Sequence, residues 1–335
     1  MTHSKANTNN KINVSQNYKL KNYDTFKKCK NRTICYNSNN SVRFTAFTEM
    51  EKYSHFFILI FNIPSSNFSQ FGGGDGLTEA TAFKIYTKAH LEELADSAVW
   101  NMNPNFTTGK YFKLMNDITD TVTIPIPYFM GTFDGQNYTV SMNIYIGPVN
   151  RIGLFRVIIN STVKNLRVTG LSRGGSYVGS IVGQAETSHI LNCHSSVFIK
   201  FNMSSAGGIA GRCSGSVIAN CSNTGTIEQI GIGSHYPSAT INGMVGGIVG
   251  FVLDSSVVLN CFNAGLIKGT PSLGGALSNY GGIVGRGPGN FSNNVNVGVV
   301  IGGENVGCIV GETVGGNAVL ENNYYDKQMC VCCEE

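Results

Sequence analysis

The sequence has little charge and little proline for its length. Charged residues make up 13% of the 335 residues, and there are eight prolines. The net charge of +4 is too small to mark a nucleic-acid-binding protein. Much of the excess comes from lysines and arginines in residues 1–49, where asparagine is common and no hydrophobic periodicity is present. That stretch is predicted to be disordered.

The sequence also lacks the helical His-Glu-x-x-His motif of zinc peptidases. Such a site needs two imidazoles one helical turn apart, with a carboxylate base between them. None of the six histidines has this spacing. Nor does any carboxylate group suggest catalysis: Asp117 and Asp134 fall at turn positions, and Asp-Gly is a common turn pair. We therefore predict no enzymatic activity, no catalytic residues, no metal and no cofactor.

Glycine, by contrast, is abundant, with 41 residues, and much of it belongs to a repeat. Variants of Gly-Gly-Ile-Val-Gly start 27, 28, 39, 35 and 26 residues apart. The six copies are Ile152–Arg156, Gly179–Gly183, Gly207–Gly211, Gly246–Gly250, Gly281–Gly285 and Gly307–Gly311. The glycines predict either positive φ or close backbone packing where the chain turns a corner.

A second register follows each copy, with an apolar residue, a spacer and an asparagine. The apolar residues are Val163, Ile190, Ile218, Val258, Phe291 and Leu320, and the asparagines are Asn165, Asn192, Asn220, Asn260, Asn293 and Asn322. Short β-like runs punctuated by turns cannot bury an apolar face alone, so successive repeats must stack. This predicts an all-β fold, a right-handed parallel β-helix (β-solenoid) of eight or nine rungs about 40 Å long. The apolar residues would form an inner column and the asparagines a ladder at a turn.

Two spacings are longer than the rest because of insertions at Ile230–Gly243 and Gly269–Asn279. Insertions in a solenoid form loops on one side of the stack, and such loops are the usual recognition elements. We expect His235, Tyr236 and Tyr280 to be exposed there and to bind a ligand.

The repeats resemble the GLUG-motif repeat proteins, and the resemblance extends beyond the repeats. Upstream, Phe71–Gly76, Phe83–Tyr86, Tyr111–Ile118 and Gly131–Val140 are similar to the entry segment of such proteins, and Asn323–Lys327 is similar to their close. The resemblance covers about residues 70–329. It implies adhesin-like surface or secreted proteins, and some members are immunoglobulin A metallopeptidases in which the repeats are not the catalytic part.

The N-terminal region contains a short apolar run, Phe56–Phe61, after a lysine-bearing start at Met50. A lysine-bearing start, a short apolar run and a stretch of small residues follow one another as in a secretory signal peptide, here over residues 50–69. The apolar run is too short to span a bilayer. On this hypothesis residues 1–49 are a mis-called upstream extension. The alternative is that residues 56–61 form a buried strand.

Residues 70–151 are predicted to be an N-terminal cap with the first rungs, and residues 152–329 the repeat solenoid. A capping helix is expected over residues 87–97, with Thr87 as N-cap and Leu91, Leu94 and Ala95 on one face. Its carboxylates are interpreted as a solvated helix face. Cys193, Cys221 and Cys261 follow the ladder asparagines and are predicted to stack as buried free thiols. Residues 330–335 form a cysteine-rich tail with no predicted role.

These observations predict a non-enzymatic extracellular or cell-surface module, an adhesin or structural stalk that presents loops to a host protein or glycan. The chain would form no membrane span after signal removal, and it could be part of a longer surface protein. Two alternatives remain: a carbohydrate-active β-helix enzyme, or the scaffold fragment of a larger secreted peptidase.

Overall fold

The computed structural model describes residues 34–36, 42–46, 59–62, 71–98, 106–147, 149–230, 243–269, 278–302, 305–314 and 318–329. The chain divides into two compact units, Met1–Ser69 and Gln70–Glu335. In the first unit three short strands form an antiparallel sheet in the order β1-β2-β3. They are β1 (Ile34–Tyr36), β2 (Val42–Ala46) and β3 (Leu59–Asn62).

The first unit differs in part from the sequence prediction. β1 and β2 lie within residues 1–49, where disorder is predicted. The β-branched and aromatic residue types of Val42–Ala46 favour a strand there. β3 overlaps the apolar run 56–61, in keeping with the strand alternative for that run. The signal peptide over residues 50–69 and the start at Met50 remain predictions.

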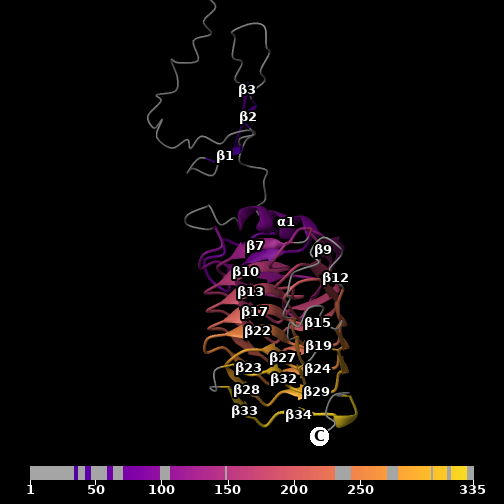
Figure 1. The fold of residues 1–335 in the computed structure, drawn as a ribbon. Coiled ribbons are helices and arrows are strands. Elements are labelled where there is room, and N and C mark those ends of the chain that lie inside the picture. Colours follow the sequence, from indigo (N-terminus) through magenta and orange to yellow (C-terminus); the bar gives the residue numbers. More distant parts are fainter. Residues whose placement is uncertain are drawn as a thin grey trace, which may run out of the picture. The chain divides into compact units, whose positions relative to one another are not determined.

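The second unit is a parallel β-helix, as the repeats predict. Successive turns of chain stack strand on strand, and the described strand pairs of this unit are parallel (Figure 1). Each complete rung contributes to a seven-stranded, a nine-stranded and an eleven-stranded sheet, and later rungs add a four-stranded sheet. The predicted tail at residues 330–335 lies outside the described residues.

The nine-stranded and seven-stranded sheets carry the two registers of the repeat. The nine-stranded sheet contains β4 (Phe83–Ile85), β5 (Tyr111–Leu114), β8 (Thr132–Asp134), β11 (Thr162–Lys164), β14 (His189–Leu191), β18 (Val217–Ala219), β23 (Val257–Leu259), β28 (Asn290–Ser292) and β33 (Val319–Glu321). The seven-stranded sheet contains β7 (Ile126–Phe129), β10 (Phe155–Ile159), β13 (Val182–Glu186), β17 (Ala210–Ser214), β22 (Val249–Leu253), β27 (Val284–Arg286) and β32 (Val310–Glu312).

The eleven-stranded sheet has long strands in the early rungs and split strands in the later ones. It contains β6 (Ile118–Val122), β9 (Thr139–Tyr145), β12 (Arg167–Gly174), β15 (His194–Phe201), β19 (Ser222–Asn223), β20 (Ile227–Gln229), β24 (Phe262–Asn263), β25 (Ile267–Lys268), β29 (Val295–Asn296), β30 (Val300–Ile301) and β34 (Tyr324–Tyr325). The four-stranded sheet contains β16 (Ser205–Gly207), β21 (Met244–Gly246), β26 (Asn279–Gly281) and β31 (Asn305–Gly307). A 3-10 helix, η2 (Lys327–Met329), follows β34.

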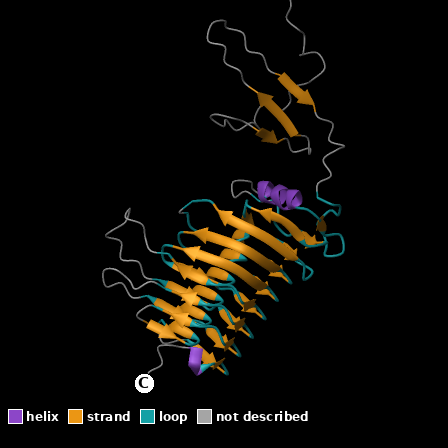
Figure 2. Cartoon of the chain, turned by 90° about the vertical axis from the view of Figure 1, so that its right-hand side faces the viewer, coloured by secondary structure: helices purple, strands orange, loops and turns teal. Residues whose placement is uncertain are grey.

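Among the described residues, one α-helix of ten residues, α1 (Lys88–Ser97), covers the first rungs (Figure 2). The side chain of Thr87 accepts a hydrogen bond from the backbone N–H of His90 and so caps the helix, as predicted. Leu91, Leu94 and Ala95 are buried, and α1 packs against β6 and β7. The predicted cap is therefore confirmed. No helix among the described residues is long and apolar enough to cross a membrane.

The predicted inner column is confirmed by the strand register. Val163 pairs with Ile190, and the same alignment continues down the nine-stranded sheet through Phe291 to Leu320. Its members are fully buried apart from Leu320, which is 49% exposed in the last rung. Stacking therefore buries apolar side chains that a single repeat would leave exposed to water.

The main role of the repeat asparagines is to adopt a left-handed backbone conformation at the turn, and few of them form a side-chain ladder. The six residues Asn165, Asn192, Asn220, Asn260, Asn293 and Asn322 have φ between 52° and 56°, the left-handed region that asparagine tolerates better than other non-glycine residues. Only Asn192 and Asn165 make the expected amide bonds among the described residues. Asn192 donates to Asn165 over 3.1 Å, and Asn165 donates to Asp134 over 3.0 Å.

This assignment gives a direct prediction at Asn260, where φ is 53°. Replacement by glycine should leave the free energy of unfolding within about 0.5 kcal/mol, whereas Asn260→Val should lower it by about 1–2 kcal/mol, because a β-branched side chain is strained at positive φ. Urea unfolding followed by circular dichroism measures both. Equal stabilities for the two variants would contradict the backbone role.

A second asparagine ladder, which the repeat pattern does not predict, is buried on the inner side of the eleven-stranded sheet. Asn223 donates to Asn263 over 3.0 Å, and Asn263 donates to Asn296 over 2.8 Å. Each also bonds the backbone two residues ahead, where a glycine stands. All three asparagines are fully buried. The Asn-x-Gly turn therefore splits each later strand in two while satisfying its buried polar groups.

The stacked thiols are confirmed. Cys193, Cys213, Cys221 and Cys261 are free and buried. The Cys193, Cys221 and Cys261 sulfurs each lie 3.3–3.4 Å from the backbone carbonyl two residues before them. Burial raises the pKa of Cys193 and Cys261 well above the value of a free thiol.

These thiols should be unreactive in the folded chain. At pH 8, iodoacetamide should leave these four cysteines unmodified until denaturant is added, because their side chains are completely buried and the reagent cannot reach the sulfurs. Peptide mass spectrometry before and after unfolding measures the modification of each one. Rapid alkylation of Cys221 in the folded protein would contradict the stacked arrangement.

Candidate functional site

Of the three predicted ligand-binding residues, the structure describes only Tyr280. His235 and Tyr236 lie outside the described residues and remain predictions. The prediction that Tyr280 is exposed is wrong, because its side chain is completely buried. It pairs in register with Val245 and Val306 and takes an inward position of the four-stranded sheet. Tyr280 is therefore a core residue.

Tyr280 nevertheless contacts residues at the start of both insertions. Its hydroxyl hydrogen-bonds the side chain of Gln229, at the start of the first insertion. A Cβ added to Gly269, at the start of the second, would collide with the Tyr280 ring. Both insertions leave the eleven-stranded sheet and return to the four-stranded sheet, on adjacent rungs. The two predicted loops therefore arise at one corner of the solenoid.

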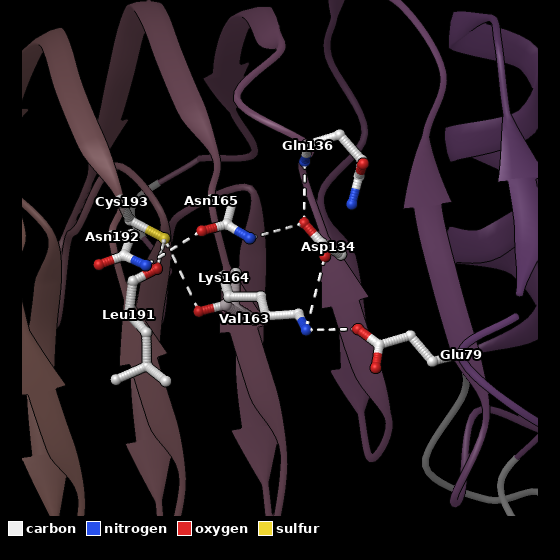
Figure 3. Close-up of polar contacts among 9 residues, drawn as sticks. All are labelled: Glu79, Asp134, Gln136, Val163, Lys164, Asn165, Leu191, Asn192 and Cys193. Atoms are coloured by element: carbon white, nitrogen blue, oxygen red, sulfur yellow. Dashed lines mark hydrogen bonds and ion pairs between the residues drawn. The ribbon is translucent and has the colours of Figure 1, made fainter.

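Of the two carboxylates considered from the sequence, Asp134 makes more polar contacts, and these contacts are structural. One carboxylate oxygen accepts bonds from the Gln136 backbone over 2.9 Å and from the Asn165 amide over 3.0 Å (Figure 3). The other lies 3.5 Å from the Lys164 ammonium, which also contacts Glu79 at 2.6 Å. The hydrogen bond to Glu79 raises the pKa of Lys164. Both oxygens of Asp134 thus hold a turn and a neighbouring rung together.

The other carboxylate considered from the sequence has a similar role. Asp117 accepts a 2.7 Å bond from the backbone N–H of Thr139, which ties β6 to the start of β9. In the described part of the chain, no three His, Cys, Asp or Glu side chains are grouped to hold a metal ion. The turn interpretation of Asp117 and Asp134 agrees with these contacts.

The surface with the most exposed large apolar groups is the outer side of the eleven-stranded sheet. On this side, strands of the sheet carry Tyr145, Phe198, Phe262, Ile301 and Tyr324, all more than a third exposed. The early part of the surface is the most regular, because β9, β12 and β15 are neighbouring long strands (Figure 1). We call the outward side chains of these three strands the β9–β15 face: Thr139, Ser141, Asn143, Tyr145, Arg167, Thr169, Leu171, Arg173, His194, Ser196, Phe198 and Lys200.

Strand register places cations beside aromatic rings on this face. Tyr145, Arg173 and Lys200 stand directly opposite one another on the three strands. The Arg173 guanidinium carbon lies 4.8 Å from the centre of the Tyr145 ring, and the Lys200 ammonium lies 4.7 Å from that of Phe198. These cation–π contacts hold the long basic side chains against the sheet. The rings stay open to solvent, with Tyr145 53% and Phe198 36% exposed.

A shallow groove of about 370 Å³ crosses the amino-terminal ends of β12 and β15. Its lining includes Arg167, His194 and the hydroxyl residues Thr139, Ser196, Ser222 and Thr224. His194 Nδ1 lies 2.8 Å from the Ser222 hydroxyl. Partial burial and the nearby charge of Arg167 lower the pKa of His194. The groove can therefore offer one fixed positive charge and several hydrogen-bonding groups.

The repeat itself matches a known family. Residues 174–200 match the GLUG motif. The chain carries a GLUG repeat. The matched residues run from the last residue of β12 through β13 and β14 into β15, so one GLUG repeat corresponds to one rung of the solenoid. The other copies of the repeat adopt the same register above and below it.

The GLUG solenoid is also similar to a solved structure. A crystal structure of a Bacteroides ovatus protein named a "putative immunoglobulin A1 protease" has 19% sequence identity and a TM-score of 0.58 to this chain. The similarity covers 78% of this chain and 79% of that one. At this identity it establishes the fold alone. No curated protein matches the chain.

The GLUG pattern could not reveal the β9–β15 face. The repeat fixes inward residues and turns, whereas Tyr145, Arg173 and Lys200 occupy equivalent outward positions with different residue types. Only the pairing register shows that they are neighbours. A usable signal was the alternation in β15, where His194, Ser196, Phe198 and Lys200 all point the same way.

Proposed function

We propose that this chain is a non-enzymatic β-solenoid module of an extracellular or cell-surface protein, acting as an adhesin or structural stalk that contacts a host protein or glycan. The β9–β15 face is the observation that supports it best, because two exposed rings and three cations share one flat surface. Exposed aromatic and arginine side chains are enriched where proteins bind partners. The loops at 230–243 and 269–279 remain a second contact region in this proposal.

An extracellular location is supported by the GLUG repeat, since the resemblance to such proteins implies surface or secreted chains. The low charge and the rigid stacked fold suit a spacer that holds a binding surface away from a cell. The carboxylates Asp117 and Asp134 are held by turn and inter-rung contacts, which favours a binding role over acid-base catalysis.

The experiment is a binding screen of the full chain on glycan and extracellular-matrix arrays, with polysaccharide cleavage assayed in parallel. Saturable binding without cleavage is expected. A Tyr145→Ala/Phe198→Ala variant and a variant with the 230–243 loop shortened then separate the two contact regions. Cleavage of any array polysaccharide would replace the adhesin proposal with the carbohydrate-active enzyme alternative.

A second candidate is the scaffold of a secreted peptidase, favoured by the name of the Bacteroides ovatus neighbour. On this proposal the chain would bind immunoglobulin A1 or a catalytic partner without cutting either. Incubation of the full chain with immunoglobulin A1, followed by electrophoresis and a pull-down, tests it. Binding without cleavage supports the scaffold role, and absence of binding removes it.

A further inference from the structure

We infer that the β9–β15 face binds a linear glycan bearing sulfate or carboxylate groups. This inference rests on the proposed function, since it names the ligand class of the same face. Three features carry it: two arginines without a carboxylate partner among the described residues, exposed rings, and a groove with hydroxyl groups.

The charge on the face is positive and mostly uncompensated. The strands β9, β12 and β15 contain no Asp or Glu. Arg167 and Arg173 take part in none of the salt bridges between described residues. Lys200 lies 3.8 Å from Glu228, but Glu228 also pairs with Lys268 at 3.4 Å. An anionic ligand would therefore meet guanidinium groups that have no competing protein carboxylate, and sulfate or carboxylate oxygens suit their forked donors.

The spacing of the cations favours an extended ligand. Arg167 and Arg173 lie on the same strand, six residues apart, which corresponds to about 20 Å. Both point outward, because each stands opposite an outward residue of β15, His194 and Lys200. A single small anion cannot reach both guanidinium groups. A short linear chain with repeated anionic groups can.

The rings and hydroxyls beside the cations distinguish a glycan from other polyanions. Tyr145 and Phe198 keep exposed ring surface beside the cations that contact them, and this surface can pack against the C–H groups of sugar rings. Toward the other end of the strands, Thr139, Ser196, Ser222 and Thr224 line the groove beside Arg167 and can hydrogen-bond sugar hydroxyls. Three cations over this area are too few to follow the dense charge of a nucleic-acid duplex.

The test measures binding of the full chain to four immobilised probes: a heparin oligosaccharide, a hyaluronan oligosaccharide, neutral dextran and duplex DNA. The native chain should bind the sulfated or the carboxylated probe, or both, and these two arms identify the anionic group. Arg167→Gln/Arg173→Gln should weaken that binding about tenfold or more, since each lost charge-assisted contact contributes to affinity. Binding should also fall as sodium chloride is raised.

The matched control is Lys84→Gln/Lys113→Gln, which removes the same charge from neighbouring strands of the nine-stranded sheet. It should change affinity less than twofold. Equal losses in both double variants would overturn the inference, as would failure to bind either anionic probe or equally tight binding to DNA. Binding of dextran or a matrix protein that depends on Tyr145 and Phe198 would also overturn it, while leaving the proposed adhesin function intact. If the chain binds no partner on any array, both the inference and the proposed function are overturned.

Discussion

Replacing Gly247 with valine is expected to destabilise the solenoid by about 3 kcal/mol or more. A Cβ at this position would lie closer than 3.0 Å to the carbonyl oxygen of Gly282 and to the Asn263 side chain, a separation that real Cβ atoms do not show. Gly208 meets Gly247 and Asn223 in the same way one rung earlier. Because the obstacle is the backbone of the next rung, no side-chain rotation relieves it.

Urea unfolding monitored by circular dichroism measures the loss at Gly247. Gly215→Asn is the matched control, because Gly215 has a φ of +55° and only the Thr187 hydroxyl, 3.9 Å away, near its added Cβ. Asparagine tolerates that conformation, so the control should stay within about 0.5 kcal/mol of the native chain. Native stability for Gly247→Val would mean that these glycines do not pack rung against rung.

Replacing Asn263 with alanine is expected to lower the free energy of unfolding by about 3 kcal/mol. Its amide links Asn223 on one side to Asn296 on the other, and its carbonyl oxygen accepts the Gly265 N–H over 3.2 Å. The substitution leaves several of these buried groups without a partner, and each unsatisfied group costs about 1–3 kcal/mol. The loss should therefore exceed that of an ordinary polar truncation.

The control for Asn263 is Asn290→Ala, at an exposed position at the start of β28. That variant should unfold within about 0.5 kcal/mol of the native chain. Differential scanning calorimetry on the three proteins compares them directly. A small and equal effect at both positions would show that the inner asparagine ladder does not stabilise the later rungs.

The sequence predicted the parts of the fold that repetition encodes. Val163 and Ile190 recur at matching places in their repeats, and this was enough to predict the inner column and its stacking. Thr87 and Leu91 likewise identified the capping helix by local pattern. The buried ladder was missed because Asn263-Ala264-Gly265 reads as an ordinary surface turn until the strands on either side are paired.

Positions that differ between repeats were harder to predict. Tyr280 looks exposed in the sequence because a tyrosine next to an insertion is usually a surface residue, yet it fills the inward place that Val245 holds one rung before. The β9–β15 face depends on which residues stand opposite across three strands, and the GLUG pattern leaves those outward positions free to vary. On such a scaffold, function therefore depends on the residues that the repeat does not specify.

The face also explains why binding and stability can be tested separately. Tyr145 and Phe198 lie on the outer side of the sheet, so truncating them leaves no cavity in the core. Gly247 and Asn263 are inside the stack and contribute nothing to that surface. Variants of the first kind should change affinity with little change in unfolding, and variants of the second kind should do the reverse.

The measurement that tests the central claim most directly is hydroxyl-radical footprinting of the full chain with and without a saturating partner from the binding screen. Tyr145 and Phe198 should lose most of their oxidation when the partner is bound. Tyr86, 39% exposed and remote in sequence from these strands, should be oxidised equally in both samples. Unchanged oxidation of Tyr145 and Phe198 with the partner bound would contradict the account and place recognition elsewhere on the chain.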